Sequence, residues 1–226
     1  MVEINPARRA NAMPARQPHR RPGGRTARVR AEVISAVTAE LAAHGYDALS
    51  IETVARRSGV HRTTIYRRWR DVGGLLADVI DAAREDDWAP PDTGYLDRDL
   101  AALGGEIHAA LTAKPSIASA LIAASFRSEQ AADALHSFWA DRYRRCEIVV
   151  TRAIQRGEVP PNTDPRQVLI AATAPVYHDL IFLGTTPKST VPEQYARAAA
   201  VAAGAGAYSR SSRRHRPRNR ANHAQR

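Results

Sequence analysis

The stretch from Ser50 to Arg70 most constrains how this chain can fold, because it holds two short helical patterns joined by a tight turn. Ser50 is a good N-cap for the first helix, since its hydroxyl can accept a hydrogen bond from a backbone amide of the first turn. Gly59 can adopt the positive φ that ends a helix, and the apolar Val60 follows it. The second helix begins near His61. The stretch therefore predicts two helices that meet at a steep angle.

The second helical pattern has one apolar and one polar side. Ile65 and Trp69 lie four residues apart, so they share a face that we expect to point inward. The polar side carries groups that bond to phosphates and to base edges. These candidate residues are His61, Arg62, Thr63, Thr64, Arg67 and Arg68. A solvated helix face is the alternative for each of them.

Charge is unevenly distributed along the 226 residues. Residues 1–70 carry a net charge of +9, residues 71–208 carry −6, and residues 209–226 carry +7. Basic ends around an acidic middle suggest a polyanion partner for the ends, and solvated tails are the alternative. Residues 1–24 combine arginine with four prolines, so we expect a disordered Arg/Pro-rich arm there and a disordered Arg-rich tail at 209–226.

Helical periodicity continues through the rest of the chain, and no useful period-two stretch appears. One helix is expected from about Thr26 to Gly45, before the two short ones, and six more after them. The six later helices are expected at about 71–87, 97–114, 116–125, 128–155, 165–183 and 193–204. The segment 116–125 is apolar on most sides and is expected to be buried, and Pro175 is expected to kink the helix that contains it.

The predicted fold class is therefore all-α, with two domains. Residues 25–71 form an N-terminal three-helix helix-turn-helix domain whose thin core depends on the helix that follows, and residues 72–208 form a larger helical domain. No apolar run reaches the roughly 20 residues that span a bilayer, and no apolar h-region of a secretory signal is present, so no membrane partner is expected. Cys146 is the single cysteine, which excludes an intramolecular disulfide and a cysteine cluster.

Residues 26–80 resemble the DNA-binding domain of tetracycline-repressor-like (TetR family) transcriptional regulators. Residues 59–69 carry most of this resemblance, because they read Gly-Val-His-Arg-Thr-Thr-Ile-Tyr-Arg-Arg-Trp against the family's common Gly-Val-Ser-x-x-Thr-Leu-Tyr-x-His/Tyr-Phe. The family continues with a polar cap and a Leu-Leu pair, which here are Asp71 and Leu75-Leu76. Residues 156–177 resemble the end of the regulatory domain in many members.

The chain departs from the family pattern at two places. Val72 stands where many members carry Lys or Arg close to a phosphate, so that contact is absent. Gly73 and Gly74 stand where members usually have helix-forming polar residues, and each glycine weakens a helix by roughly 1 kcal/mol relative to alanine. We therefore expect a looser helix start after Asp71.

The resemblance implies a sequence-specific, ligand-responsive transcriptional regulator that binds a palindromic operator in double-stranded DNA and represses transcription. It implies a homodimer formed through the last two helices, and a cavity for a small-molecule effector of unknown identity. It also implies the larger domain's role in ligand binding and dimerisation, a bacterial cytoplasmic location associated with the nucleoid, and no cofactor.

On this resemblance, the polar side of the second short helix has specific roles. Thr63 and Thr64 approach base edges or thymine methyl groups. Arg62 and Arg67 read guanine or bind phosphate. Tyr66 and Arg68 bind the DNA backbone. Arg25 is expected to enter a minor groove or bind phosphate together with other arginines near the N-terminus, namely Arg20, Arg21 and Arg28.

Aromatic and histidine side chains of the larger domain are candidates for the wall of the effector cavity. They are Phe126, Trp139, Tyr143, Tyr177 and His178. Such a wall would be mostly apolar with a few hydrogen-bonding tips, as small-molecule sites usually are. Ordinary core aromatics are the alternative for each of them.

Two other classes of protein are the alternatives to a regulator. An enzyme is not expected, because there is no Gly-rich phosphate loop, no Gly-x-Ser-x-Gly motif and no histidine in metal-ligand spacing. An Arg-tailed nucleoid or RNA-associated protein without operator specificity is the remaining alternative. A regulator should prefer its operator over bulk DNA by about 10³-fold or more, which separates the two.

Overall fold

The computed structural model describes residues 24–84, 87–185 and 190–210 of the chain. All regular structure in these residues is helical, with one isolated β-bridge between Thr163 and Ser209. Residues 1–23 of the predicted arm and 211–226 of the predicted tail lie outside the described residues. The α-helices are α1 (Gly24–His44), α2 (Ile51–Ser58), α3 (Arg62–Trp69), α4 (Val72–Ala82), α5 (Leu96–Thr112), α6 (Ile117–Ser125), α7 (Glu129–Arg156), α8 (Pro165–Tyr177) and α9 (Val191–Gly204), and the π-helix η1 (His178–Phe182) follows α8. The predicted all-α fold class is confirmed.

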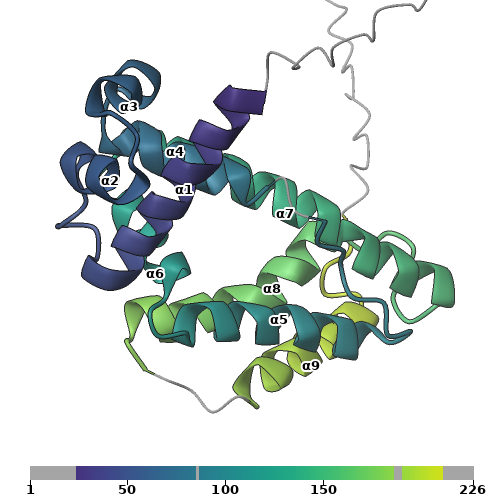
Figure 1. The fold of residues 1–226 in the computed structure, drawn as a ribbon. Coiled ribbons are helices and arrows are strands. Elements are labelled where there is room, and N and C mark those ends of the chain that lie inside the picture. The colour runs from purple at the N-terminus through teal and green to yellow at the C-terminus, as the bar shows by residue number, and fades with distance from the viewer. Residues whose placement is uncertain (1–23, 85–86, 186–189, 211–226) are drawn as a thin grey trace, which may run out of the picture.

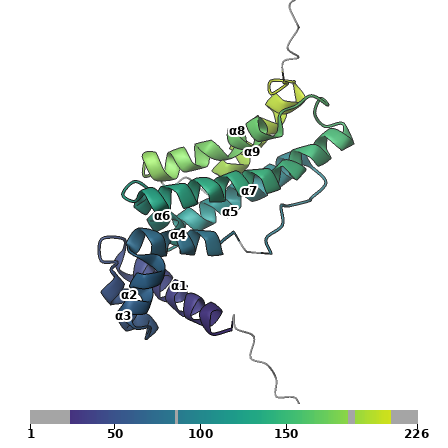
Figure 2. The same cartoon turned by 90° about the horizontal axis from the view of Figure 1, so that it is seen from above.

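Helices α1, α2 and α3 gather at one end of the molecule, and α4 leads from them into the rest (Figure 1). Helices α5, α7, α8 and α9 form the larger part, in which α9 lies against both α5 and α8. The view from above shows the same separation (Figure 2). Helix α6 lies where the two parts meet, because it contacts α1, α4, α5 and α7.

Local side-chain chemistry explains where several helices begin and end. The Ser50 hydroxyl accepts from the Thr53 amide at 3.1 Å, and the Thr53 hydroxyl accepts from the Ser50 amide at 3.0 Å, which completes a capping box at α2. Gly59 ends α2 with a φ of 69°, in the left-handed region that favours glycine. Asp71 and Asp164 cap α4 and α8 by accepting backbone N–H bonds. The predicted caps at Ser50 and Asp71 and the predicted stop at Gly59 are confirmed.

Two clusters of buried side chains hold the helices together. One joins α1, α2 and α3 around Ile65 and continues into α4 at Leu76. The same cluster includes Ala124 of α6 and Ala131 of α7. The other cluster joins α5, α7, α8 and α9. The three N-terminal helices thus share their core with the helices that follow, as the thin apolar content of residues 25–71 predicts.

Helix α6 differs from the expectation of a buried segment. Ala124 is its one fully buried residue, and its other side chains are half-buried or exposed. The reason is that Ile117, Leu121 and Ile122 face a cavity rather than packed atoms. Among the described residues no single helix is both long and apolar enough to cross a membrane. Helices α5 and α6 meet that length and composition only when they are taken together, and they are bent by 83° relative to each other.

The helix predicted over 165–183 consists of two parts. Helix α8 continues through Pro175, and η1 then adds a wider turn in which the Leu183 amide donates to the His178 carbonyl at 3.0 Å. Such a bond spans five residues and is the mark of a π-helix. The Tyr195 hydroxyl of α9 donates to Asp179 Oδ2 at 2.6 Å, which fastens this wider turn to α9.

Gly74 allows α4 to start directly against the end of α3. A Cβ atom at this position would lie 2.1 Å from the carbonyl oxygen of Trp69 and 3.1 Å from its carbonyl carbon. At Gly73 the nearest atom, at 2.2 Å, is the side-chain oxygen of Gln130, which can move away. Gly74 thus serves a close approach between two helices, and the expected loosening at the start of α4 stays a prediction.

This close approach predicts a strong effect of Gly74→Ala. The added methyl group would force the α3–α4 junction apart, and overpacking of this kind costs about 1–3 kcal/mol. Gly105→Ala is the matched control, because it lies within α5 and a Cβ there meets nothing within 4 Å. We expect Gly74→Ala to lower the melting temperature by roughly 2–4 °C per kcal/mol, and Gly105→Ala to leave it equal or higher. Differential scanning calorimetry of both variants checks this, and equal melting temperatures would contradict it.

Candidate functional site

Helix α3 presents its predicted polar side to solvent. His61, Arg62, Thr63, Tyr66, Arg67 and Arg68 are exposed and Thr64 is half-buried. Ile65 and Trp69 are buried, so the helix is anchored by the face opposite to these polar groups. Tyr66 keeps 65% of its surface exposed, which is high for an aromatic side chain. The helix therefore offers a continuous surface of hydrogen-bond donors and cations.

The start of α1 lies beside the end of this surface. Arg68 Nη1 donates to the Thr26 carbonyl oxygen at 3.4 Å, and the Arg68 guanidinium lies 4.9 Å from the ring centroid of Trp69. Arg25, which is exposed and adjacent to Thr26, belongs to the first turn of α1. The predicted arm therefore becomes helical before Arg25, and Arg28 lies one turn further along the same helix.

Asp78 of α4 joins α3 and α1. Its Oδ2 accepts from the indole Nε1 of Trp69 at 2.7 Å, and its Oδ1 pairs with the Arg30 guanidinium at 2.8 Å. Both bonds are charge-assisted, and such bonds are shorter and stronger than neutral ones. The orientation of α3 is thus tied to the position of α4.

Glu40 joins α1 to α2. Its carboxylate is buried and accepts from Arg57 Nε at 2.5 Å. The hydrogen bond from Arg57, together with the nearby positive charges, holds the pKa of Glu40 below its ordinary value despite burial. This pair fixes α2 against α1, and α2 in turn supports α3.

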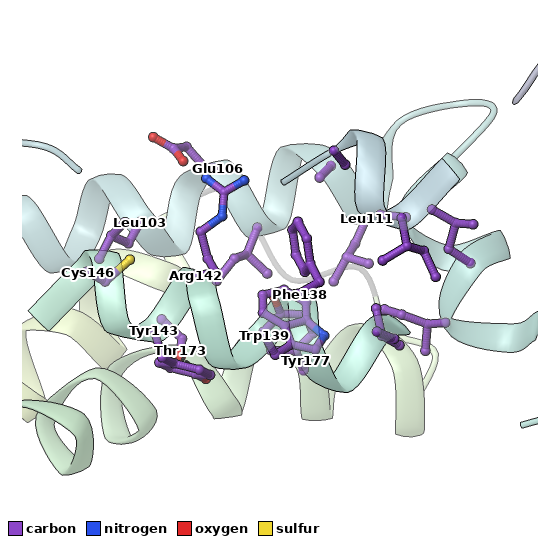
Figure 3. Close-up of a pocket in the computed structure, with 18 of the residues that line it drawn as sticks. Leu103, Glu106, Leu111, Phe138, Trp139, Arg142, Tyr143, Cys146, Thr173 and Tyr177 are labelled. Carbon is purple, nitrogen blue, oxygen red and sulfur yellow. Dashed lines mark hydrogen bonds between the residues drawn. The ribbon is translucent and has the colours of Figure 1, made fainter. Parts of the chain in front are cut away.

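A cavity of about 400 Å³ lies in the larger part, between α4, α5, α6, α7 and α8 (Figure 3). Its wall is mostly apolar. Trp139 and Tyr143 reach it from α7 and Tyr177 from α8. The Trp139 ring meets Tyr177 edge-on with centroids 5.3 Å apart, and meets Phe138 edge-on at 5.0 Å. The volume falls in the range of about 300–1,000 Å³ that small-molecule sites occupy.

Cys146 and Tyr177 place a neutral thiol and a neutral hydroxyl in the cavity wall, beside the hydroxyls of Tyr143 and Thr173. The Tyr143 and Thr173 hydroxyls lie 3.1 Å apart, and Thr173 donates to the Leu169 carbonyl at 2.8 Å. Burial raises the pKa of Cys146 to about 11 and raises that of Tyr177 well above its ordinary value. These groups can therefore give or accept hydrogen bonds without carrying charge.

Trp88 closes one side of the cavity. Its Nε1 donates to Glu106 Oε2 at 2.9 Å, and Arg145 donates to its backbone oxygen. The Arg142 guanidinium lies 4.0 Å from the Trp88 ring centroid, within the range of a cation–π contact. Figure 3 shows Glu106 and Arg142 on the same side of the cavity.

Phe126 and His178 do not belong to this cavity. Phe126 is 74% exposed because it lies at the C-cap of α6, past the turn that faces inward. His178 is exposed because it follows the inward-facing Tyr177, and neighbouring residues of a helix point about 100° apart. Among the five residues predicted for the wall, Trp139, Tyr143 and Tyr177 line the cavity.

Sequence reasoning missed most of the cavity wall, including Trp88 and Glu106. Trp88 lies in the connection between α4 and α5, where no periodicity marks a facing side, and Glu106 lies on an exposed part of α5. The sequence could have indicated Phe138 and Arg142 as wall residues, because they lie with Trp139 on the apolar stripe of α7. Within the described residues no group of three or more His, Cys, Asp or Glu side chains is arranged to hold a metal ion.

Helices α2 and α3, with their glycine turn and exposed polar surface, define a helix-turn-helix protein. Residues 33–79 match the family model described as bacterial regulatory proteins, tetR family. Residues 90–201 match the tetracyclin repressor-like C-terminal domain. The chain belongs to the TetR family of helix-turn-helix transcriptional regulators.

Several known proteins are similar to this chain over most of its length. The HTH-type transcriptional regulator AqdR of Rhodococcus erythropolis is 32% identical over 173 residues, which cover 75% of this chain and 83% of that protein. The DNA-binding transcriptional repressor TetR of Mycobacteroides abscessus is 32% identical over 145 residues, 62% of this chain and 75% of that protein. The solved structure of the TetR family transcription regulator SCO0332 is 30% identical, covers 79% of this chain and 97% of its own, and has a TM-score of 0.59.

Membership of the family bears on the class of protein. Its members are DNA-binding transcriptional regulators, not enzymes, and they form dimers and bind small-molecule effectors. The comparisons give no support to a nucleoid or RNA-associated protein without operator specificity.

The Glu40–Arg57 pair predicts how stability depends on pH. Because folding lowers the pKa of Glu40, the carboxylate stabilises the fold above its ordinary value of 4.5, and this contribution is lost as the pH falls through the lowered value. We expect Glu40→Gln to melt below the unchanged protein at pH 7, and the difference to shrink below about pH 4.5. Thermal unfolding by circular dichroism across this range measures both.

The control for this experiment is Glu32→Gln. Glu32 pairs with Arg28 on the exposed side of α1, and such surface pairs contribute about 0–1 kcal/mol. Its melting temperature should stay close to that of the unchanged protein at both ends of the range. A constant difference between Glu40→Gln and the unchanged protein over the whole range would show that the charge of Glu40 plays no part.

Proposed function

We propose that the chain is a homodimeric repressor that binds a palindromic operator and releases it when a small-molecule effector enters the cavity. Residues 25–71 would act as the DNA-binding unit and residues 72–208 as the regulatory and dimerisation unit. The observation that carries this proposal is the shared helix α4, which holds α3 through Asp78 and lines the cavity through Ile80 and Ala83. Its work on chromosomal DNA would place it in the bacterial cytoplasm, on the nucleoid.

The exposed side of α3 supports a role in reading the major groove. A recognition helix contacts base edges through its N-terminal residues, and here Arg62 and Thr63 occupy the first turn. Tyr66 and Arg67 follow one turn later on the exposed surface. Arg25 at the start of α1 adds a cation beside the C-terminal end of α3, where a phosphate would approach.

The coupling between cavity and DNA follows from the geometry of α4. Ile80 and Ala83 lie at its cavity end, and Asp78 lies at a neighbouring turn, bonded to Trp69. A ligand that displaces the cavity end of α4 must either move α3 or break the 2.7 Å bond between Asp78 and Trp69. Moving α3 changes the distance between the two recognition helices of a dimer, and hence the fit to half-sites about 34 Å apart.

An apolar surface on α8, η1 and α9 supports dimerisation through these elements. Its large members are Ile170, Phe182, Leu183 and Val201, each exposed by 40% or more. On α9, alanine and glycine residues flank Val201, so a second helix can approach α9 closely. Exposed apolar patches of this kind usually mark interfaces.

Removing one hydroxyl tests DNA binding. Tyr66→Phe should weaken operator binding by about 0.5–1.5 kcal/mol, because the helix loses one hydrogen bond to a phosphate. Tyr95→Phe is the matched control, since Tyr95 is also exposed, at 54%, but precedes α5. Fluorescence anisotropy at two salt concentrations, on an operator selected from random DNA, measures both variants. Thr64→Ala is measured beside them, and unchanged affinity for both Tyr66→Phe and Thr64→Ala would overturn the assignment of α3.

A charge on the apolar surface tests dimerisation. Val201→Glu should leave each subunit folded, because the side chain is 67% exposed, but should shift the protein toward monomers at micromolar concentration. Phe126→Glu is the control, since Phe126 is similarly exposed but lies at the end of α6. Size-exclusion chromatography with light scattering gives the mass of each. A dimeric Val201→Glu protein would exclude the proposed interface.

A further inference from the structure

Tyr177 has a hydroxyl in the cavity wall that the protein leaves unused. Within the described residues it makes no hydrogen bond, although the ring is held edge-on against Trp139. Burial raises its pKa, so it stays a neutral phenol with a proton to donate.

Tyr143 differs from Tyr177 in this respect. Thr173 uses its single hydroxyl proton on the Leu169 carbonyl, so the Tyr143 hydroxyl must be the donor to Thr173 Oγ1. The proton of Tyr143 is therefore engaged within the protein. Of the two tyrosines, Tyr177 is the one that can donate to a ligand, and an unmet donor in an apolar cavity favours a ligand that accepts.

The charges around the cavity oppose each other. Glu106 and Arg142 both line it, from α5 and α7 (Figure 3). Their effects on the pKa of Cys146 have opposite signs, since Arg142 lowers it and Glu106 raises it. An anion drawn to Arg142 would meet Glu106, and a cation drawn to Glu106 would meet Arg142. Neither sign of ligand charge is favoured over the other.

Two aromatic rings of the cavity wall already hold a cation of the protein. The Arg142 guanidinium lies 4.0 Å from the Trp88 centroid and 5.2 Å from that of Phe138. Cation–π contacts extend to about 6 Å, so Arg142 occupies both. The Trp139 and Tyr177 rings remain, arranged edge to face, and this geometry suits a further aromatic ring.

From these contacts we infer that the effector is an uncharged aromatic compound with a hydrogen-bond acceptor, such as a carbonyl, that receives the proton of Tyr177. The inference rests on the proposed role of the cavity as the effector site, and names the class of compound that fits it. The aromatic body would lie against Trp139, with the acceptor next to the Tyr177 hydroxyl.

Four matched naphthalene probes, substituted at the same ring position, test this class. Acetylnaphthalene is neutral and carries an acceptor, and isopropenylnaphthalene has the same shape without one. Naphthoate supplies a negative charge and naphthylmethylammonium a positive one. Isothermal titration of the full-length protein, without DNA, is expected to show that acetylnaphthalene binds more tightly than either charged probe and about 3- to 10-fold more tightly than isopropenylnaphthalene, the contribution of one hydrogen bond.

Two variants assign the preference to one hydroxyl. In Tyr177→Phe the affinity ratio of acetylnaphthalene to isopropenylnaphthalene should fall by the same 3- to 10-fold, to about one or below. In Tyr143→Phe the ratio should stay as in the unchanged protein, because that hydroxyl is engaged with Thr173. The ratio compares two ligands on the same protein, so a change in stability does not move it.

Three outcomes would overturn the inference. They are tighter binding of a charged probe, a preference for acetylnaphthalene that persists in Tyr177→Phe, and no binding of any probe. Operator binding is measured separately, so the two proposals fail separately. Failure of all probes on a protein that still binds its operator removes only the ligand class, whereas a preferred acetylnaphthalene that does not release DNA removes only the proposed release mechanism.

Discussion

The bond between Asp78 and Trp69 is the interaction on which the arrangement of the two parts depends. One carboxylate holds the last residue of the exposed helix with one oxygen and Arg30 of α1 with the other, at 2.7 and 2.8 Å. Hydrogen bonds to charged groups contribute about 1.5–3 kcal/mol each, and the carboxylate is largely removed from solvent. Gly74 adds a second close contact between α3 and α4, since only a residue without a Cβ can pack against the Trp69 carbonyl. Helices α3 and α4 therefore behave as one rigid corner.

The larger part is built differently, because its α4, α6 and α7 sides border a cavity and not a filled core. Protein interiors are otherwise packed as densely as organic crystals, so a space of this size leaves the side chains around it with fewer contacts. Helix α6 shows the result, with apolar residues that stay half-buried. The larger part thus has one region where packing is incomplete, next to the tightly packed junction of α3 and α4.

Local chemistry explains how much of this could be predicted. The caps at Ser50, Asp71 and Asp164 were predictable because each is a bond between a side chain and an amide two or three residues away. The polar surface of α3 was predictable for a similar reason, since spacing alone separates it from Ile65 and Trp69. Composition could not show that α6 borders a cavity, because an apolar residue looks the same beside atoms or beside empty space. The meaning of Gly74 depends on Trp69 approaching it, which no local pattern records.

The positions of the tryptophans have a practical consequence. The chain has three, and each lies at a place where the proposed function would act. Trp69 donates to a carboxylate at the junction of α3 and α4, while Trp88 and Trp139 border the cavity. Indole emission responds to nearby charge and to solvent, so the unlabelled protein carries its own optical probes. Replacing Trp88 and Trp139 with phenylalanine would leave one fluorophore, Trp69, that reports only on the corner of helices next to the DNA.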